Sequence, residues 1–292
     1  MTKFFKDGGF KGRIIKVICF LLALTVIICI WQYLSEHFYP RIGVIPSPLK
    51  TLATVRSEMA KDSFFKAVFG TLSRSIISFV YAFVPAFILA ALSHIFKPLK
   101  QFFNPFIAIC RAMPTIALIF IIILIVGTEK LPLLIALLVV FPLVYENIYA
   151  AFENVDKSLL AMANVFKVGR LRQITGIYLP AILPYIFSSV IAGFGLNIKV
   201  VIAAEVMGLP SMSIGYLILV ANQRMDFTIS FAWLAIAVVL SYLCETVLKI
   251  ISRFSMPYIY PDRKILKTYC KKAFHKVKGL VGAIKAKGGT GR

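Results

Sequence analysis

Long apolar stretches without a charged residue constrain this chain more than any other feature. The first runs over residues 17–34 and follows a cluster of lysine and arginine residues. A helix of about 20 mostly apolar residues spans the hydrocarbon core of a bilayer, and it satisfies its own backbone polar groups there. The sequence is 60% hydrophobic, well above the share in a soluble domain. The pattern therefore predicts an all-α, polytopic membrane protein.

Six stretches satisfy this criterion, so we expect about six transmembrane helices. Residues 127–130 predict a short turn on the outer side, between the third and fourth spans. The polar segment between the first two spans predicts an amphipathic helix on the outer surface of the membrane. The six spans cover residues 17–34, 75–96, 105–127, 131–149, 177–204 and 227–251.

The basic residues predict the orientation. The net charge is +21, and from Arg253 onward the chain has eleven lysine or arginine residues against one acid. Basic residues concentrate on the cytoplasmic side, which predicts a bacterial inner-membrane protein with both termini in the cytoplasm. We divide the chain into a basic N-terminus (1–16), a transmembrane domain (17–252) and a basic tail (253–292). The tail is expected to bind the anionic bilayer surface rather than nucleic acid.

Motifs for catalysis, metal binding or nucleotide binding are absent from the sequence. No Gly-Lys dipeptide occurs, so the chain cannot form a Walker A loop. The HExxH and GxSxG patterns are also absent, and the five cysteines include no CxxC pair. The sequence therefore predicts no enzyme activity, and no metal or cofactor site, in this chain.

Few polar or ionisable residues lie within the expected spans. A secondary transporter couples ions through buried acids or histidines, and their scarcity disfavours that class. Asn197 and Lys199 on the fifth span, and Glu205 directly after it, are candidates for a translocation path. There Lys199 suits an anionic solute, although it equally fits a side chain that reaches to the outer interface. Small residues at every fourth position of the second span predict close helix packing, and they are Ser78, Ala82, Ala86 and Ala90.

The loop between the fourth and fifth spans is the most informative segment. The Asp156 carboxylate can cap a short helix over residues 157–166 by accepting hydrogen bonds from its first backbone N–H groups. Val168-Gly169 predicts a turn, and a second short helix follows over residues 170–177. Leu179-Pro180 is expected to end that helix, because proline has no backbone N–H.

This loop resembles the EAA loop of the permeases of ABC importers. The family consensus reads Glu-Ala-Ala, three residues, Gly, nine residues, Ile-x-Leu-Pro, and residues 177–180 (Ile-Tyr-Leu-Pro) match its end. With this anchor the consensus Glu falls on Ala161, the two alanines on Met162 and Ala163, and the Gly on Lys167. The Glu and the Gly are therefore replaced, and the next glycine stands two positions late.

Short motifs elsewhere in the chain occur in the order found in this family. They resemble the branch that serves nitrate, taurine, aliphatic sulfonates and thiamine precursors, and the resemblance covers residues 46–253. The motifs are Ile45-Pro46-Ser47-Pro48, Thr71-Leu72-Ser73-Arg74, Asn104-Pro105-Phe106, Met113-Pro114, Phe141-Pro142 and Gly215-Tyr216-Leu217-Ile218.

The resemblance implies a permease subunit that works with several partners. Two copies, most simply a homodimer, line the path, and an extracytoplasmic solute-binding protein delivers the solute. Cytoplasmic ABC ATPase subunits use the ATP, and each contacts one EAA-like loop. The residues assigned to this contact are Leu160, Ala161, Met162, Ala163, Phe166, Lys167, Gly169, Leu179 and Pro180.

Within this loop we expect the exposed apolar side chains of Leu160, Met162 and Phe166 to provide the buried anchor of the ATPase contact. The small Ala163 is expected to pack closely against the ATPase. A secondary transporter or channel without ATPase partners is the alternative function. Co-purification of an ATPase subunit with the chain in mild detergent would distinguish the two functions.

The charge distribution makes a prediction about topology. Reporter fusions at Gly9 and at Gly282 are both expected to report the cytoplasm, because the basic clusters flank the first and last spans on the same side. The measurement is the activity of a compartment-sensitive reporter in intact cells. A periplasmic signal from either fusion would contradict the six-span arrangement.

Overall fold

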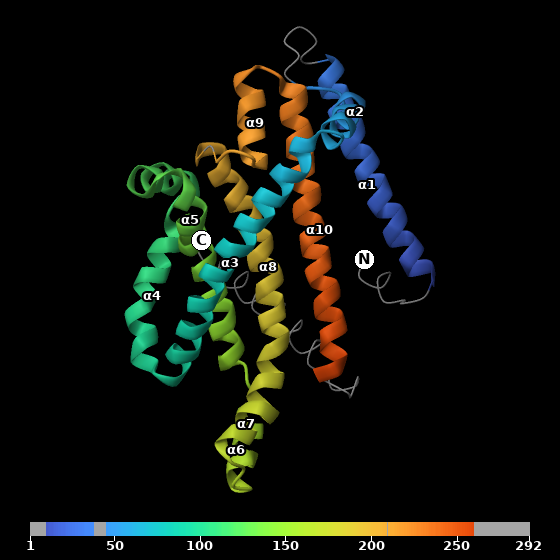
Figure 1. Ribbon diagram of the computed structural model, residues 1–292. Coiled ribbons are helices and arrows are strands. Elements are labelled where there is room, and N and C mark those ends of the chain that lie inside the picture. Colours follow the sequence, from blue (N-terminus) through green and yellow to red (C-terminus); the bar gives the residue numbers. More distant parts are fainter. Residues whose placement is uncertain (1–9, 38–44, 209, 260–292) are drawn as a thin grey trace, which may run out of the picture. The chain divides into compact units, whose positions relative to one another are not determined.

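The computed structural model of the protein describes residues 10–37, 45–208 and 210–259. Every regular element within these ranges is a helix (Figure 1), which confirms the predicted all-α class. The elements in chain order are α1 (Phe10–His37), α2 (Pro48–Met59), α3 (Asp62–Ile95), α4 (Lys97–Ala112), α5 (Thr115–Glu153), α6 (Lys157–Val165), α7 (Arg170–Gln173), the π-helix η1 (Ile174–Tyr178), α8 (Leu179–Gly208), α9 (Ile214–Gln223) and α10 (Phe227–Ile259).

Four helices in the described ranges are long and apolar enough to cross a membrane. They are α3, α5, α10 and the continuous run Arg170–Gly208, which ends with α8. Shorter apolar stretches lie in α1 (Leu21–His37) and in α9. These helices confirm the predicted polytopic fold. Residues 260–292 of the basic tail, which is expected to bind the bilayer surface, lie outside the described residues.

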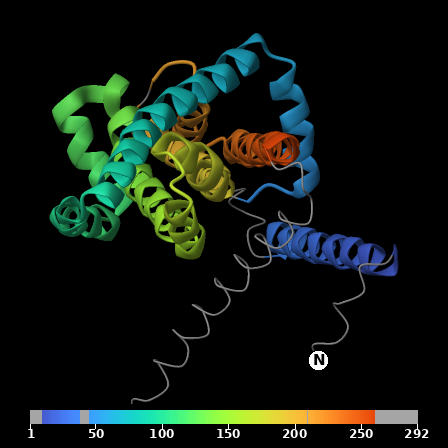
Figure 2. The same cartoon turned by 90° about the horizontal axis from the view of Figure 1, so that it is seen from below.

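The second span begins earlier than the sequence predicts. It is expected from Ser75, whereas α3 begins at Asp62, directly after a sharp corner that follows α2 (Figure 2). At this corner the Lys61 N–H donates to the Glu58 carbonyl at 3.1 Å. The predicted surface helix is therefore only α2, whose N-terminus the Ser47 side chain caps.

The third span, residues 105–127, is predicted to be a single helix, and this prediction is wrong. A break between α4 and α5 divides it. Met113 follows α4 in an extended conformation (φ −71°, ψ 129°). Pro114 explains the break, because the residue before a proline is disfavoured in the helical region. At Gly127, φ is 73° and ψ is −174°. The predicted outer turn over residues 127–130 is therefore confined to a one-residue kink within α5.

The chain divides into two compact units, and the long helices contribute residues to both. The first unit contains the described parts of Met1–Ser78, Pro114–Ala136 and Asn197–Ser241. The second unit contains the described parts of Phe79–Met113, Leu137–Leu196 and Tyr242–Arg292.

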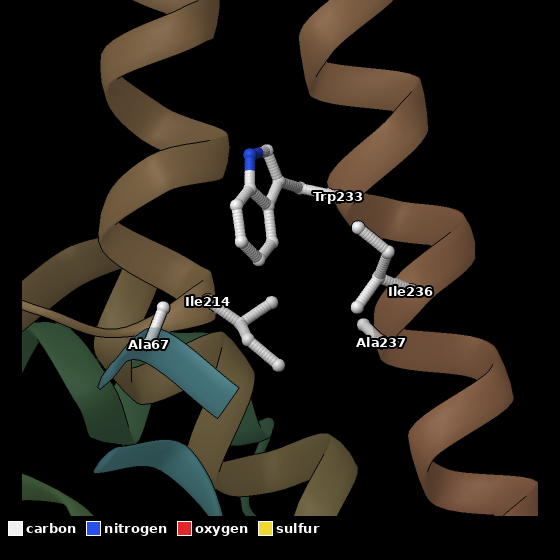
Figure 3. Close-up of a cluster of buried hydrophobic side chains, with 5 residues drawn as sticks. All are labelled: Ala67, Ile214, Trp233, Ile236 and Ala237. Atoms are coloured by element: carbon white, nitrogen blue, oxygen red, sulfur yellow. The ribbon is translucent and has the colours of Figure 1, made fainter. Parts of the chain in front are cut away.

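Each unit has its own apolar cluster. In the first unit, side chains from α3, α9 and α10 point toward one another (Figure 3) and exclude water from the start of α9. They are Ala67, Ile214, Trp233, Ile236 and Ala237. In the second unit, the end of α5 and the start of α8 pack together through Ala151, Val155 and Ile182.

Candidate functional site

The predicted loop between the fourth and fifth spans forms a helical corner in the second unit. α6 begins after Asp156, whose carboxylate accepts a hydrogen bond from the Ser158 N–H at 2.9 Å. This confirms the predicted cap and the predicted short helix. α7 and η1 follow α6 and lead directly into α8 (Figure 1). We call residues 157–178 the α6–η1 segment.

Lys167 turns the chain between α6 and α7 in a left-handed conformation, with φ of 51°. Its N–H donates to the Asn164 carbonyl at 3.0 Å, and the Val168 N–H donates to the Ala163 carbonyl at 2.9 Å. This is the Schellman arrangement, which favours glycine at the left-handed position. The EAA consensus places its glycine on Lys167, so the geometry accounts for that glycine. Gly169 has φ of −59°, which any residue adopts.

One face of α6 packs inside the chain. Leu160 packs against the apolar cluster of the second unit. Ala163 lies almost one turn further along and is only 4% exposed. The sequence predicts that both residues contact the ATPase directly, whereas their side chains pack within this chain. Helical spacing explains the difference, because positions three apart share one face.

The opposite side of the segment is exposed and apolar. Met162 and Phe166 lie there, as the sequence predicts. Val165 shares this face of α6, and Leu171 is exposed on α7; both were missed by reasoning based on the consensus. Each of these four side chains is more than half exposed: Met162 53%, Val165 79%, Phe166 74% and Leu171 80%.

Leu179 and Pro180 do not end the helix that begins at Arg170, so that prediction is wrong. In η1 the Leu179 N–H donates to the Ile174 carbonyl, five residues back. A π-turn is wider than an α-turn, and it accommodates the missing N–H and the ring of Pro180. The helical run therefore continues from α7 into α8, which connects the α6–η1 segment to a membrane-spanning helix.

A histidine at the end of α3 packs against both ends of this loop. The His94 ring stacks on Phe152 with centroids 5.2 Å apart, and it meets Tyr178 edge-on at 6.1 Å. Its Nδ1 lies 3.5 Å from the Glu153 carboxylate, which also accepts a hydrogen bond from the Tyr149 hydroxyl at 3.0 Å. No local sequence pattern indicates this group, because His94 is distant in the chain from its partners.

In the first unit, Glu205 on α8 holds α3 and α9 in place. Its buried carboxylate accepts hydrogen bonds from the Thr71 hydroxyl at 2.8 Å and from the Arg74 guanidinium at 2.9 Å. It also accepts from the Gly215 N–H at 3.3 Å, and the Ile214 N–H donates to the Thr71 hydroxyl at 3.0 Å. The free N–H groups at the start of α9 thus find partners. Two motifs quoted from the sequence meet around this carboxylate.

Asn197 makes a second polar contact between α3 and α8. Its amide donates to the Ser75 carbonyl at 2.7 Å and to the Ser78 hydroxyl at 3.2 Å. Asn197 is fully buried, whereas Lys199 is exposed. The structure therefore brings Asn197 and Glu205 together with α3, and their part in a translocation path stays a prediction. The row of small residues is buried at all four positions, Ser78, Ala82, Ala86 and Ala90.

Residues 82–257 match the family described as the inner membrane component of binding-protein-dependent transport systems. The chain belongs to this family. The putative aliphatic sulfonates transport permease protein SsuC of Bacillus subtilis is 27% identical over 235 residues, which cover 80% of this chain and 84% of that protein. A probable ABC transporter permease protein of Haemophilus influenzae is 26% identical over 235 residues, which cover 76% and 89%.

Solved ABC transporters share the fold of this permease. The chain matches a subunit of the inward-facing MetNI methionine ABC transporter with a TM-score of 0.55 and 16% identity, covering 65% of this chain and 94% of that one. It matches a chain of a bacterial ABC transporter that imports the acidic polysaccharide alginate with a TM-score of 0.56 and 17% identity, covering 82% and 97%.

These comparisons confirm the family that the motifs indicate, and the Bacillus subtilis relative is named for aliphatic sulfonates, one of the solutes of the branch that the motifs resemble. The permease is the membrane-spanning subunit of an ABC importer and a multi-pass protein of the inner membrane. The alternative, a secondary transporter or channel without ATPase partners, receives no support from them. The match to a transport family is consistent with the prediction that the chain is not an enzyme.

The packing around Glu205 predicts that Gly215 tolerates no side chain. A Cβ at this position would lie 2.4 Å from the Glu205 Cβ and 2.6 Å from the Val206 nitrogen. Gly215→Ala is expected to lower stability by about 1–3 kcal/mol. The loss of stability is measured by thermal unfolding in detergent. Tryptophan fluorescence is the signal, because Trp233 packs beside Ile214. Gly176→Ala is the control, since no atom lies within 4 Å of its Cβ. Equal stability of the two variants would contradict this packing.

The left-handed turn predicts that Lys167→Gly stabilises the corner. A non-glycine residue in this conformation costs roughly 1–2 kcal/mol, so amide hydrogen exchange in α6 is expected to slow. Hydrogen-exchange mass spectrometry of the full-length permease measures this rate. Ala161→Gly, in the middle of α6, is the control and is expected to speed exchange because glycine weakens a helix interior. Faster exchange in Lys167→Gly would show that the turn is not strained.

Proposed function

We propose that two copies of this permease line the translocation path, and that a separate ATPase moves them through the α6–η1 segment. The observation that carries the proposal is the exposed apolar surface of Met162, Val165, Phe166 and Leu171. These side chains stand on a capped helical corner that has its own hydrogen bonds. Because a corner of this kind keeps its shape, it can transmit a displacement to α8.

The charges around this corner support a cytoplasmic position. Lys157, Lys167, Arg170 and Arg172 are exposed in the same segment, and basic residues concentrate on the cytoplasmic side of inner-membrane proteins. Exposed apolar side chains rimmed by polar residues are typical of a protein–protein contact. An ATPase subunit in the cytoplasm, which hydrolyses the ATP, is the partner that an ABC importer requires.

A binding protein on the outer side is the second proposed partner. The family name refers to binding-protein-dependent transport. A structure of the alginate transporter contains a periplasmic protein bound to alginate pentasaccharide. By analogy, we propose that a solute-binding protein delivers the solute to the outer face of this permease.

For the path itself we propose that Lys199 contacts solute, because it is exposed on α8 while its polar neighbours are occupied by hydrogen bonds. A lysine in the path favours an anion. The Bacillus subtilis relative is named for aliphatic sulfonates, which are anions of this kind. Asn197 and Glu205 hold α8 against α3 in this proposal, and thereby set the position of Lys199.

The proposal predicts that Phe166→Ala weakens binding of the ATPase. Truncation of a central aromatic anchor typically costs about 2 kcal/mol or more, a factor of about 30 in affinity. The measurement is the dissociation constant of the purified cognate ATPase for the permease in lipid nanodiscs. Insertion and thermal stability are expected to stay unchanged, because Phe166 is exposed.

Phe65→Ala is the matched control for this measurement. Phe65 is also highly exposed, but it lies in the first turn of α3, at the end of the second span that is predicted to face the outer side of the membrane. The ATPase is expected to bind this variant as tightly as it binds the parent. Undiminished affinity in Phe166→Ala would remove Phe166 from the contact.

A further inference from the structure

The side chain of Gln173 spans the corner between α6 and α7. Its amide nitrogen donates to the Asn164 side-chain oxygen at 3.0 Å and to the Val168 carbonyl at 2.9 Å. Asn164 belongs to the last turn of α6, Val168 to the turn itself, and Gln173 is the last residue of α7. One amide group therefore joins all three parts of the corner.

The backbone alone does not fix the angle of this corner. The Schellman bonds at Lys167 close the end of α6 but do not include any residue of α7. α7 is a single turn of four residues, and its N-terminal cap residue, Gly169, has no side chain to contribute. Within the described residues, Gln173 makes two side-chain hydrogen bonds that connect α7 to the end of α6 and to the turn.

Gln173 also occupies the position at which a movement of α6 would pass into the membrane. The next residue, Ile174, begins η1, and η1 continues into α8 without a break. If the Gln173 bonds hold, a displacement of α6 carries α7 and the start of α8 with it. If they are lost, the left-handed turn at Lys167 becomes a hinge that absorbs the displacement.

We propose that Gln173 is a positioning residue for energy coupling: its amide locks α6 and α7 into one rigid body, which transmits the ATPase movement to α8. This inference rests on the proposed contact between the ATPase and the α6–η1 segment. It goes further because Gln173 lies outside the Glu-Ala-Ala, Gly and Ile-x-Leu-Pro positions of the consensus. Its role is mechanical, and it does not require Gln173 to touch the ATPase.

Two substitutions separate the donor function of Gln173 from its size. Gln173→Glu keeps the shape but replaces the donating nitrogen with an oxygen, which repels the Asn164 and Val168 oxygens. A glutamate here can also pair with Arg170 three residues earlier, so α7 itself is not weakened. Gln173→Lys retains N–H donors that can reach both oxygens. Gln101→Glu, at an exposed glutamine of α4, controls for the change in charge.

The experiment uses the complete transporter, with its cognate ATPase, in lipid nanodiscs. ATP with vanadate is the probe, because it traps the ATPase without any need to know the solute. Hydrogen-exchange mass spectrometry records how trapping the ATPase changes deuterium uptake in α8. We expect Gln173→Glu to reduce this change, by a factor of about 2 to 10 for the loss of a hydrogen bond. Exchange in α6 and α7 should become faster. ATP hydrolysis should persist, and Gln173→Lys and Gln101→Glu should behave like the parent.

The outcomes distinguish this inference from the proposed function. An unchanged response of α8 in Gln173→Glu would overturn the role of Gln173, and so would an equal loss in Gln173→Lys. If the parent transporter retains its ATPase but trapping leaves the exchange of α6 unaltered, the proposed contact at the α6–η1 segment fails instead. Loss of the ATPase from Gln173→Glu but not from Gln173→Lys would support the lock, because a loose corner cannot present the apolar surface.

Discussion

The end of a helix leaves backbone N–H or carbonyl groups without partners, and a protein in a bilayer must satisfy these groups itself. Two short helices of this permease, α6 in the loop between the membrane-spanning helices and α9 in the first unit, show how such ends find partners. At α6 the Asp156 carboxylate caps the first turn and a left-handed Lys167 closes the last. At α9 the caps are Ser213, Thr71 and Glu205. The polar residues that stand out in the sequence are largely those that close helices.

This constraint explains why Glu205 lies within an apolar helix. A buried carboxylate is costly unless charged and hydrogen-bonding partners surround it. Arg74 supplies the charge, while Thr71 and the backbone of α9 supply further donors. The resulting cluster fixes the start of α9 against α3 and α8, and it does so with residues from two of the family-like motifs. Helix docking therefore accounts for the residues of those motifs that surround Glu205.

The sequence predicted local features well and distant contacts poorly. The Asp156 carboxylate was sufficient to predict the start of α6, because a cap acts within one turn. The prediction of the third span as one helix failed at Met113 and Pro114. The sequence stays apolar there, but the residue before a proline is disfavoured in the helical conformation, so the helix breaks. At Pro180 the error is the opposite one. A helix end was predicted there, but the π-turn of η1 accommodates the proline and the helix continues. The partners of Glu205 and Asn197 on α3 lie 119 to 134 positions away in the chain, so no local pattern could reveal them, and the part of both residues in a path stays a prediction.

Site-specific photo-cross-linking most directly tests the central claim, that the exposed corner of α6 and α7 receives the ATPase. A photoreactive amino acid would replace Phe166 in the intact transporter in cells, and the cross-linked partner would be identified by mass spectrometry. Our account predicts a cross-link to the ATPase subunit, with a yield that changes when ATP and vanadate trap the transporter. Cross-links to lipid or to a second permease copy, without the ATPase, would contradict it.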